Sequence, residues 1–271
     1  MSVEGRSTEM SRSRSPDSRG VLFIVGTGPG DAGHITSHAL YVIAQSEYVV
    51  GHRFYLDMLG EALKGKQVVS SSMGGEVERA QRSVELAKDH VVTIVSGGDP
   101  GVYGMASIVL EVMDSLGLDI PVEVVPGVTA ATAAAARLGS PLSGDFAVIS
   151  LSDLFTPWES IVKRLEAVLS AGIPVVLYNP RSEQRSGNLH SALAIAARAL
   201  PEGTPVGVVR NAYRPDEEVR VTTLGGLLQD DSFVDMRSTV IIGRAESRLW
   251  RVGRNVKGII TPRGYARKYV Y

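Results

Sequence analysis

The chain contains no cysteine, which excludes disulfide bonds, thiolate metal sites and cysteine nucleophiles and fits a reducing compartment. A charge imbalance is also missing, because 28 Lys and Arg residues nearly cancel 29 Asp and Glu residues. The chain therefore has no overall field that would hold a polyanion such as nucleic acid. Long apolar runs are absent too, since Gly, Pro or charge interrupts each one before it could form a signal peptide or a membrane span. We expect a cytoplasmic protein that binds neither nucleic acid nor membranes.

The composition is typical of a globular protein, with 44% hydrophobic and 21% charged residues. A length of 271 residues predicts about two domains. Residues 1–19 are rich in Ser and Arg and have too few apolar side chains to offset the entropy of ordering, so a disordered extension is predicted there. The alternative is an arginine-rich segment that folds on RNA.

Short runs rich in Val and Ile alternate with longer helix-like stretches from residue 21 onward, which is typical of an α/β protein. Before the Gly-Ser-Pro break at 139–141, strands are predicted at 21–25, 47–50, 67–70, 91–96 and 122–125. After it, strands are predicted at 146–150, 175–179, 206–210, 219–223 and 239–243. Helices are predicted at 35–45, 76–89, 104–116, 128–138, 157–170 and 188–200.

These two sets of strands predict two similar-sized α/β domains, at residues 20–139 and 140–248, followed by a C-terminal tail at 249–271. The runs VVTIVS, VVLYN and TVIIG are apolar on both faces, as expected for central parallel strands flanked by helices. Open α/β sheets bind ligands in the crevice beyond the carboxyl ends of such strands. Binding and catalytic residues are therefore expected in the loops that follow the strands.

The first candidate is the loop GTGPGD at residues 26–31, whose glycines let the backbone approach a ligand closely. It matches neither the dinucleotide fingerprint, which needs glycine where Asp31 stands, nor a P-loop, which needs a later Lys followed by Ser or Thr. Asp31 would also repel phosphate, so a neutral or cationic ligand is favoured. The alternative is a tight turn that Asp31 caps.

The second candidate is the loop GGDPGVYG at residues 97–104. Its free backbone groups at a strand end need water or a ligand as partners. Asp99 can accept hydrogen bonds from a ribose or an amine, and its charge favours a nearby sulfonium or ammonium. The alternative is that Asp99 caps the helix that starts at Gly104.

The third candidate is PGVTAATAAAA at residues 126–136, where the alanines predict a helix packed closely on a sheet. At its start, Thr129 and Ala130 leave room for a flat ring. The segments YNPRS (178–182) and RNAYRP (210–215) also follow strands and have turn-chemistry explanations. His34 and His38 lie four residues apart, but no third ligand recurs at metal spacing, so no metal site is predicted.

Five motifs follow one another along the chain: GTGPGD, SGGDPGVYG, VVPGVTAATAAAARLGSPL, VLYNP and VRNAYRPDE. Over residues 21–246, this ordered set resembles the tetrapyrrole (corrin/porphyrin) methyltransferase family. Within that family, GGDPGVYGM with VLYNPRS and the C-terminal ITPRGY is similar to the C17-methyltransferases of cobalamin biosynthesis, which act on precorrin-3B or cobalt-precorrin-3.

The resemblance implies a homodimer in which each chain has two αβα domains with mostly parallel five-stranded sheets. S-adenosylmethionine would lie in the trough between them and leave as S-adenosylhomocysteine. By motif, the residues expected to hold this cofactor are Pro29, Gly97, Gly98, Asp99, Val102, Thr129, Ala130, Asn179, Ala212, Thr239 and Val240. Asn179 stands where related members often carry Met, so the contact at that position is open.

The implied reaction is in-line attack of a tetrapyrrole carbon on the sulfonium methyl, with methylation at C17 coupled to ring contraction. Positioning and exclusion of water would supply most of the rate. A base must remove a proton during contraction, and Asp31 or His34 is expected in that role. The substrate carries carboxylates, so Arg53, Arg181 and Arg214 are its expected partners.

Two alternatives to this function remain open. The first is methylation of another tetrapyrrole, uroporphyrinogen III or precorrin-4, which the mass of the substrate would distinguish. The second is a non-catalytic protein that only binds the methyl donor, which would show tight binding of the donor without turnover.

Overall fold

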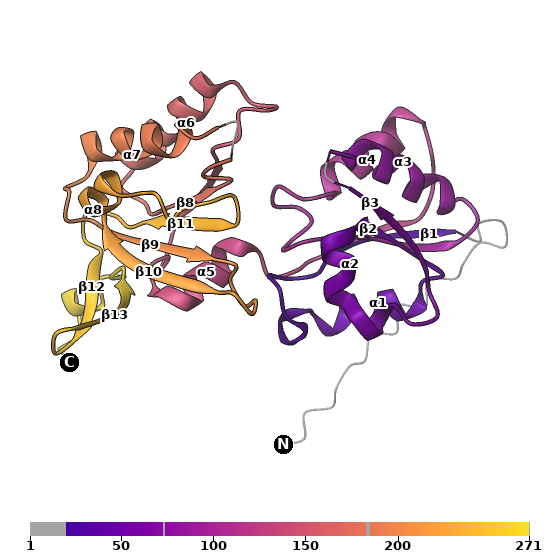
Figure 1. Ribbon diagram of the computed structural model, residues 1–271, viewed down its shortest axis with the longest axis horizontal. Helices are drawn as coiled ribbons and strands as arrows, with labels where there is room; N and C mark the ends of the chain where they lie inside the picture. The colour runs from indigo at the N-terminus through magenta and orange to yellow at the C-terminus, as the bar shows by residue number, and fades with distance from the viewer. Residues whose placement is uncertain (1–19, 73, 183–184, 271) are drawn as a thin grey trace, which may run out of the picture.

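The computed structural model describes residues 20–72, 74–182 and 185–270. It forms two α/β lobes that lie side by side (Figure 1). We call residues 20–125 the N-terminal lobe and residues 130–270 the C-terminal lobe, joined by residues 126–129. The extension predicted at residues 1–19 lies outside the described residues. No helix in the described part of the chain combines the length and apolar character needed to cross a membrane.

The N-terminal lobe contains one parallel sheet in the order β3-β2-β4-β1-β5. Its strands are β1 (Val21–Gly26), β2 (Tyr48–His52), β3 (Gln67–Ser71), β4 (Val91–Ser96) and β5 (Val122–Val125). Successive side chains of a strand point to opposite faces, so Ile24 packs with α3 (Glu76–Leu86) and α4 (Ala106–Ser115). Val25 packs on the other face with α1 (Ser37–Gln45) and α2 (Arg53–Leu59). This is the predicted arrangement of parallel strands covered on both faces.

The C-terminal lobe contains a sheet in the order β10-β9-β11-β8-β7. Its strands are β7 (Ala147–Ser150), β8 (Val175–Tyr178), β9 (Pro205–Arg210), β10 (Glu218–Thr223) and β11 (Ser238–Ile242). Only β7 and β8 pair in parallel, whereas β11 runs antiparallel to both β8 and β9, and β10 antiparallel to β9. The fold class is confirmed, but the expectation of mostly parallel strands holds for the first sheet and not for this one. A central strand is buried on both faces in either direction, so its apolar run does not reveal its direction.

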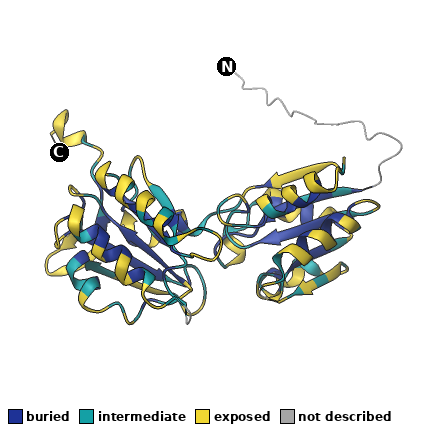
Figure 2. Ribbon diagram, turned by 90° about the horizontal axis from the view of Figure 1, so that it is seen from above, coloured by how far each residue is buried: buried dark blue, intermediate teal, exposed yellow. Residues whose placement is uncertain are grey.

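Helices cover both faces of this second sheet as well. On one face lie α6 (Trp158–Ser170), α7 (Asn188–Ala199) and α8 (Leu224–Gln229). On the other face, α5 (Ala130–Leu138) places Ala131, Ala134 and Leu138 against Val176, Val209 and Ile241. The alanine-rich helix is thus a close-packing helix, as predicted, and it packs on the second sheet although it precedes residue 139. Figure 2 shows the buried strands enclosed between the exposed faces of the helices.

A third sheet was not predicted. It joins the two-residue strand β6 (Gly139–Ser140) to the hairpin of β12 (Arg248–Val252) and β13 (Asn255–Ile260), in the order β12-β13-β6. Part of the segment expected as a tail is therefore a sheet, and Ile259 within it is fully buried. Three short 3-10 helices complete the described chain: η1 (Ala32–His34), η2 (Gly60–Leu63) and η3 (Tyr265–Arg267).

Every predicted strand and helix is present, with ends that differ by a few residues. The elements that were missed are α2, α8, the 3-10 helices and the third sheet. The helices and β6 are short, so their sequences cover too few periods for a pattern to stand out. β12 and β13 have five and six residues, most of them exposed, and so lack the apolar run that marked the other strands.

Candidate functional site

Strand ends from both lobes gather at one site. The carboxyl ends of β1, β4 and β5 lie at the same edge because these strands are parallel neighbours. In the C-terminal lobe, the register pairs Ser238 with Arg210 and Val240 with Leu177. The antiparallel strand β11 therefore begins at the edge where β8 and β9 end.

Backbone packing joins the three loops of the N-terminal lobe. Gly28 and Gly98 donate to each other's carbonyl oxygens at 3.1 and 2.8 Å. A Cβ atom on Gly127 would lie 2.2 Å from the Gly98 oxygen and 2.9 Å from the Gly26 carbonyl carbon. Only glycine permits this approach, so the loops 26–31, 97–105 and 126–129 form one unit.

Asp99 ties two of these loops together. Its Oδ1 accepts the N–H of Gly101 at 2.8 Å and its Oδ2 accepts the N–H of Gly127 at 3.0 Å. The alternative that Asp99 caps the following helix is wrong, because α4 begins at Ala106 and has no side-chain cap. Asp99 instead sets the position of the loop 97–105 relative to residues 126–129.

Tyr178, at the end of β8, fastens the start of α5. Its hydroxyl lies 2.6 Å from the Thr129 Oγ1 and accepts the N–H of Ala131 at 2.6 Å. Thr129 is the N-cap residue, yet its own side chain makes no capping bond. Burial raises the pKa of the Tyr178 hydroxyl, so it stays neutral. Thr129 and Ala130, both expected at the cofactor, are thereby fixed to the second sheet.

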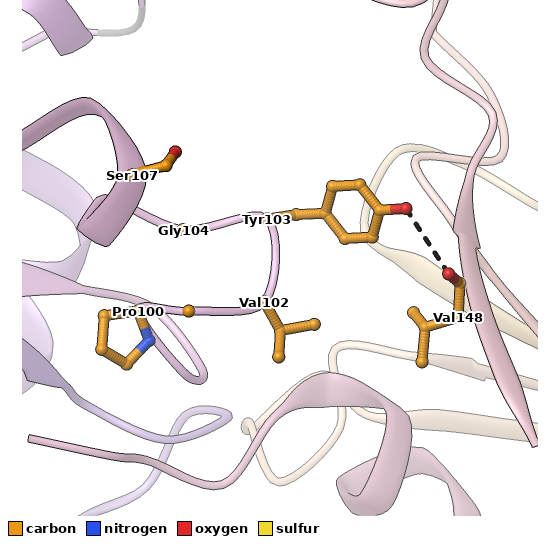
Figure 3. Close-up of a pocket in the computed structure, with 7 residues that line it drawn as sticks. Pro100, Val102, Tyr103, Gly104, Ser107 and Val148 are labelled. Carbon is orange, nitrogen blue, oxygen red and sulfur yellow. Dashed lines mark hydrogen bonds between the residues drawn. The ribbon is translucent and has the colours of Figure 1, made fainter. Parts of the chain in front are cut away.

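Tyr103 reaches from the loop 97–105 to β7, as Figure 3 shows. Its hydroxyl donates to the Val148 oxygen at 3.4 Å and accepts the N–H of Ser150 at 3.1 Å. Beside it lies an open cavity of about 500 Å³. The cavity is lined by Pro100, Gly101, Val102, Tyr103, Gly104, Ser107 and Val148, so residues of both lobes form its walls.

A second bridge between the lobes runs from the loop after β9 to the loop after β1. The Arg214 Nε donates to the Pro29 carbonyl at 2.9 Å, and its guanidinium lies 4.8 Å from the centre of the Phe54 ring. A Cβ atom on Gly30 would lie 2.4 Å from the Arg214 Cγ. The glycine of this loop therefore makes room for the arginine, and burial lowers the pKa of Arg214.

Strained backbone is concentrated in the same loops. Within the described chain, the non-glycine residues with positive φ are Tyr103 (53°), Asn179 (51°), Asn211 (50°) and Tyr213 (60°). All four follow the carboxyl ends of β4, β8 or β9. Such conformations cost about 1–3 kcal/mol each and persist only where surrounding contacts impose them, which is typical of functional sites.

Most of the predicted cofactor residues lie in the loops that follow the strands, whereas Thr239 and Val240 lie within β11. Pro29 is buried and gives its carbonyl to Arg214. The Asn179 amide donates to the Ser150 Oγ at 2.9 Å, which commits that side chain to β7. Thr239 is 8% exposed, and Val240 is fully buried in the core of the C-terminal lobe.

The three predicted substrate arginines have different surroundings. Arg181 forms an ion pair with Asp231 at 2.6 Å within the C-terminal lobe. The Arg53 side chain is 82% exposed and lies 3.9 Å from Asp57. Arg53 directly precedes Phe54, whose ring the Arg214 guanidinium covers. Of the three, Arg214 is the one that bridges the two lobes.

The two predicted acid–base residues contact each other. The His34 Nδ1 and the Asp31 Oδ1 are 2.5 Å apart, and the His34 ring lies 3.9 Å from the Tyr213 ring between centroids. The other histidine of the pair, His38, bonds Glu123 at 2.8 Å instead. His34 is therefore held by both lobes at the mouth of the loop 26–31.

Several residues of the site were missed. Phe54 contacts Arg214, and a Cβ atom on Gly97 would meet the Tyr55 ring at 2.2 Å. Both residues follow β2, so the rule that strand ends carry function would have found them had α2 been predicted. Val148 and Ser150 carried no signal, since they contact Tyr103 through backbone groups.

Comparison with known proteins places these features in a family. The sequence profile described as "Tetrapyrrole (Corrin/Porphyrin) Methylases" matches residues 21–228. The "Probable cobalt-factor III C(17)-methyltransferase" of Salmonella typhimurium is 42% identical over 247 residues, which is 90% of this chain and 99% of the relative. The "Precorrin-3B C(17)-methyltransferase" of a Sinorhizobium species is 40% identical over 252 residues, 91% of this chain and 98% of the relative.

A solved structure of "the methyltransferase CobJ" superposes with a TM-score of 0.82 at 31% identity, covering 90% of this chain and 100% of that one. Some relatives are longer proteins, and the chain spans 54% and 46% of two of them. With 90% of this chain covered, the match to CobJ extends through both lobes.

Proposed function

Because the chain belongs to the tetrapyrrole (corrin/porphyrin) methylase family, we propose that it is an S-adenosylmethionine-dependent methyltransferase of cobalamin biosynthesis. Its substrate is precorrin-3B or its cobalt-containing counterpart, methylated at C17 with contraction of the ring. The observation that carries this proposal is that the loops of both lobes meet across one trough, where Tyr103 bonds β7 and Arg214 bonds the Pro29 carbonyl. Relatives of nearly equal length carry the C17-methyltransferase name.

The trough has the chemistry that the methyl donor requires. Pro100, Val102 and Val148 give the cavity of about 500 Å³ apolar walls that suit a flat base and a thioether. Exposed backbone groups of the loop 97–105 are available to ribose and amino groups, and the Asp99 carboxylate lies in the same loop. When bound, S-adenosylmethionine supplies the activated methyl group.

The residues of this chain would then act mainly by positioning. Gly97, Gly98 and Val102 approach the donor from one lobe, while Asn179 and Ala212 approach from the other. Thr129 and Ala130, fixed by Tyr178, close the side between them. Contacts across the trough exclude water and align donor and substrate, which is where most of the rate of methyl transfer arises. Asp31 and His34, in mutual contact at the mouth, are proposed to take the proton released during contraction.

The finer features are proposals as well. We propose that the protein acts in the cytoplasm as a homodimer, with the metal, where present, belonging to the substrate. We also propose two domains, with their boundary before α5 (Ala130–Leu138) and not at residue 139 as expected from the sequence, because α5 packs on the second sheet.

The decisive experiment is a mass spectrum of the trimethylated precursor, metal-free and cobalt-loaded in parallel, after incubation with purified protein and S-adenosylmethionine. We expect the mass of one methyl group to be gained by one of the two. If neither precursor gains a methyl group although the donor binds, the substrate is a different tetrapyrrole of this family. Binding of the donor without turnover of any tetrapyrrole would instead identify a donor-binding protein.

A further inference from the structure

Arg79, in the first turns of α3, is a buried cation that no carboxylate of the described residues contacts at hydrogen-bond distance. Its side chain is 5% exposed. One terminal nitrogen, NH1, donates to the Ser71 Oγ at 2.5 Å, and the other, NH2, faces the Met105 Sδ at 3.5 Å. The Nε has no hydrogen-bond partner among the described residues. The Glu76 carboxylate comes no closer than 3.9 Å and is 46% exposed.

Other arginines of the chain have a carboxylate at hydrogen-bond distance, although the Nε atoms of Arg181 and Arg210 are, like that of Arg79, buried without a partner among the described residues. Arg137, Arg181 and Arg210 each have a carboxylate oxygen within 2.6–2.8 Å. A buried guanidinium that has only a hydroxyl and a thioether as neighbours lacks the charge partner that offsets its desolvation. Burial accordingly lowers the pKa of Arg79. The guanidinium therefore keeps one unused donor, the buried Nε, and directs another at the weak acceptor Met105.

The location of Arg79 connects it to the proposed site. Ser71 ends β3, and Met105 directly follows Gly104 in the wall of the cavity of about 500 Å³. The Met105 N–H is held by the Ser96 Oγ at the end of β4, at 3.3 Å. Arg79 therefore lies behind the rim of the trough, at the end of β3 and away from β1 and β5.

We propose that Arg79 binds a carboxylate of the tetrapyrrole substrate, which replaces the Met105 thioether opposite its guanidinium. The inference rests on the proposed function, because that substrate is a polycarboxylate. A thioether is a weak acceptor on a flexible side chain and yields readily. A carboxylate matches the guanidinium fork and forms the short, charge-assisted pair that Arg79 lacks.

The test compares Arg79→Met with the wild type, using uroporphyrin III as a stable polycarboxylate probe. Arg79→Met replaces the buried guanidinium by an apolar side chain and so removes its desolvation penalty, which should leave the melting temperature equal or higher. The Kd for S-adenosylmethionine should stay within about twofold, and the Kd for uroporphyrin should rise at least about tenfold. Affinity for the tetrapyrrole and stability would then change in opposite directions, which a structural arginine would not produce.

Arg82→Met is the matched control, since Arg82 lies three residues further along α3 and is exposed. It should change none of the three quantities. An unchanged Kd for uroporphyrin in Arg79→Met would overturn the proposal, and so would a fall in melting temperature with equal loss of both ligands. If Arg79→Met does not fold, Arg79→Lys decides: a Kd for uroporphyrin raised about threefold or more at unchanged melting temperature supports the proposal, and an unchanged Kd overturns it.

The proposed reaction and this inference can fail separately. A wild-type protein that binds uroporphyrin but methylates neither precursor would refute the reaction, and the comparison of the Kd values would still test Arg79. A wild-type protein that binds no tetrapyrrole would refute both.

Discussion

The hydroxyl of Tyr178 caps the start of α5, which the N-cap residue of a helix normally does with its own side chain. Thr129 occupies the N-cap position of α5 without capping it, and the Ala131 N–H is instead accepted by Tyr178 from the end of β8. A helix and a strand that are distant in sequence are joined at the place where the cofactor is expected. The arrangement of Thr129 and Ala130 thus depends on a residue of another element.

Replacing Tyr178 by Phe should therefore affect both stability and ligand binding. Loss of the hydroxyl leaves the Ala131 N–H and the Thr129 hydroxyl without their partner, which we expect to lower the free energy of unfolding by about 1 kcal/mol. The Kd for S-adenosylmethionine should rise several-fold, because α5 is no longer fixed at its start. Chemical denaturation and titration calorimetry measure the two effects. Tyr41→Phe, at a residue that is 61% exposed, should change neither, and a wild-type Kd in Tyr178→Phe would contradict this role.

Among the elements, the three glycine-rich loops of the N-terminal lobe leave the least freedom for substitution. A Cβ atom on Gly127 would meet backbone atoms of both neighbouring loops, and backbone cannot move aside as a side chain can. Gly127→Ala should separate the loops, lower stability by about 1–3 kcal/mol and abolish measurable binding of S-adenosylmethionine. Gly203→Ala is the control, since a Cβ atom there meets open space. Binding at wild-type affinity in Gly127→Ala would show that the loops are not a rigid unit.

The contact between α5 and the loop after β9 is expected to depend on pH. The Arg137 Nε donates to both Glu217 oxygens at 2.8 and 3.0 Å, and the Tyr213 N–H donates to the same carboxylate at 2.7 Å. Burial acts to raise the pKa of Glu217, but these hydrogen bonds outweigh it and hold the pKa below the ordinary value of 4.5. The stabilisation is therefore complete above pH 4.5 and is lost as the pH falls through the lower folded-state pKa.

Glu217→Gln makes this dependence measurable. At pH 7 the variant should be less stable than the wild type by about 1 kcal/mol, because Arg137 is partly exposed and the pair is screened by solvent. The difference should shrink steadily below pH 4.5. Urea denaturation across this range provides the comparison, and a constant difference at every pH would exclude an ionised Glu217 as the cause.

Element by element, the sequence predicted much of the fold because hydrophobic runs and glycine breaks are local signals. The strand VVTIVS and the alanine-rich helix were located correctly from such signals. The direction of β11 was not, because the burial pattern of a central strand is the same in either direction. Nor was β6, whose two residues form a strand only by pairing with β13.

For the site, the sequence located the loops but not the roles of their side chains. Asp99 was recognised as important, yet its bonds to Gly101 and Gly127 depend on loops that meet only in three dimensions. Arg181 was assigned to the substrate because the substrate carries carboxylates, whereas its pairing with Asp231, fifty residues away, leaves no trace in sequence. Arg79 was not considered, since its burial is a tertiary property.

At the scale of the whole molecule, ligand binding depends on the contacts that hold the two lobes in position relative to each other. Arg214→Met should remove the hydrogen bond to Pro29 and the contact with Phe54, which is worth about 0.5–1 kcal/mol. We expect each lobe to remain folded, the amides of residues 29–34 and 211–214 to exchange hydrogen faster, and the affinity for S-adenosylmethionine to fall several-fold. Hydrogen-exchange mass spectrometry resolves these segments. Arg53→Met, at a side chain that is 82% exposed, should behave as wild type, and unchanged exchange in both segments would show that Arg214 does not connect the lobes.

The parallel pairing of β13 with β6 also sets an order of events during synthesis of the chain. Gly139 and Ser140 leave the ribosome long before Ile259 and Ile260, their partners in the third sheet. Both large sheets can form from residues made earlier, but the segment that follows α5 is paired only once residue 260 has been translated. A messenger RNA truncated between codons 243 and 255 would thus encode all ten strands of the two large sheets. It would not encode β13, the partner of residues 139–140.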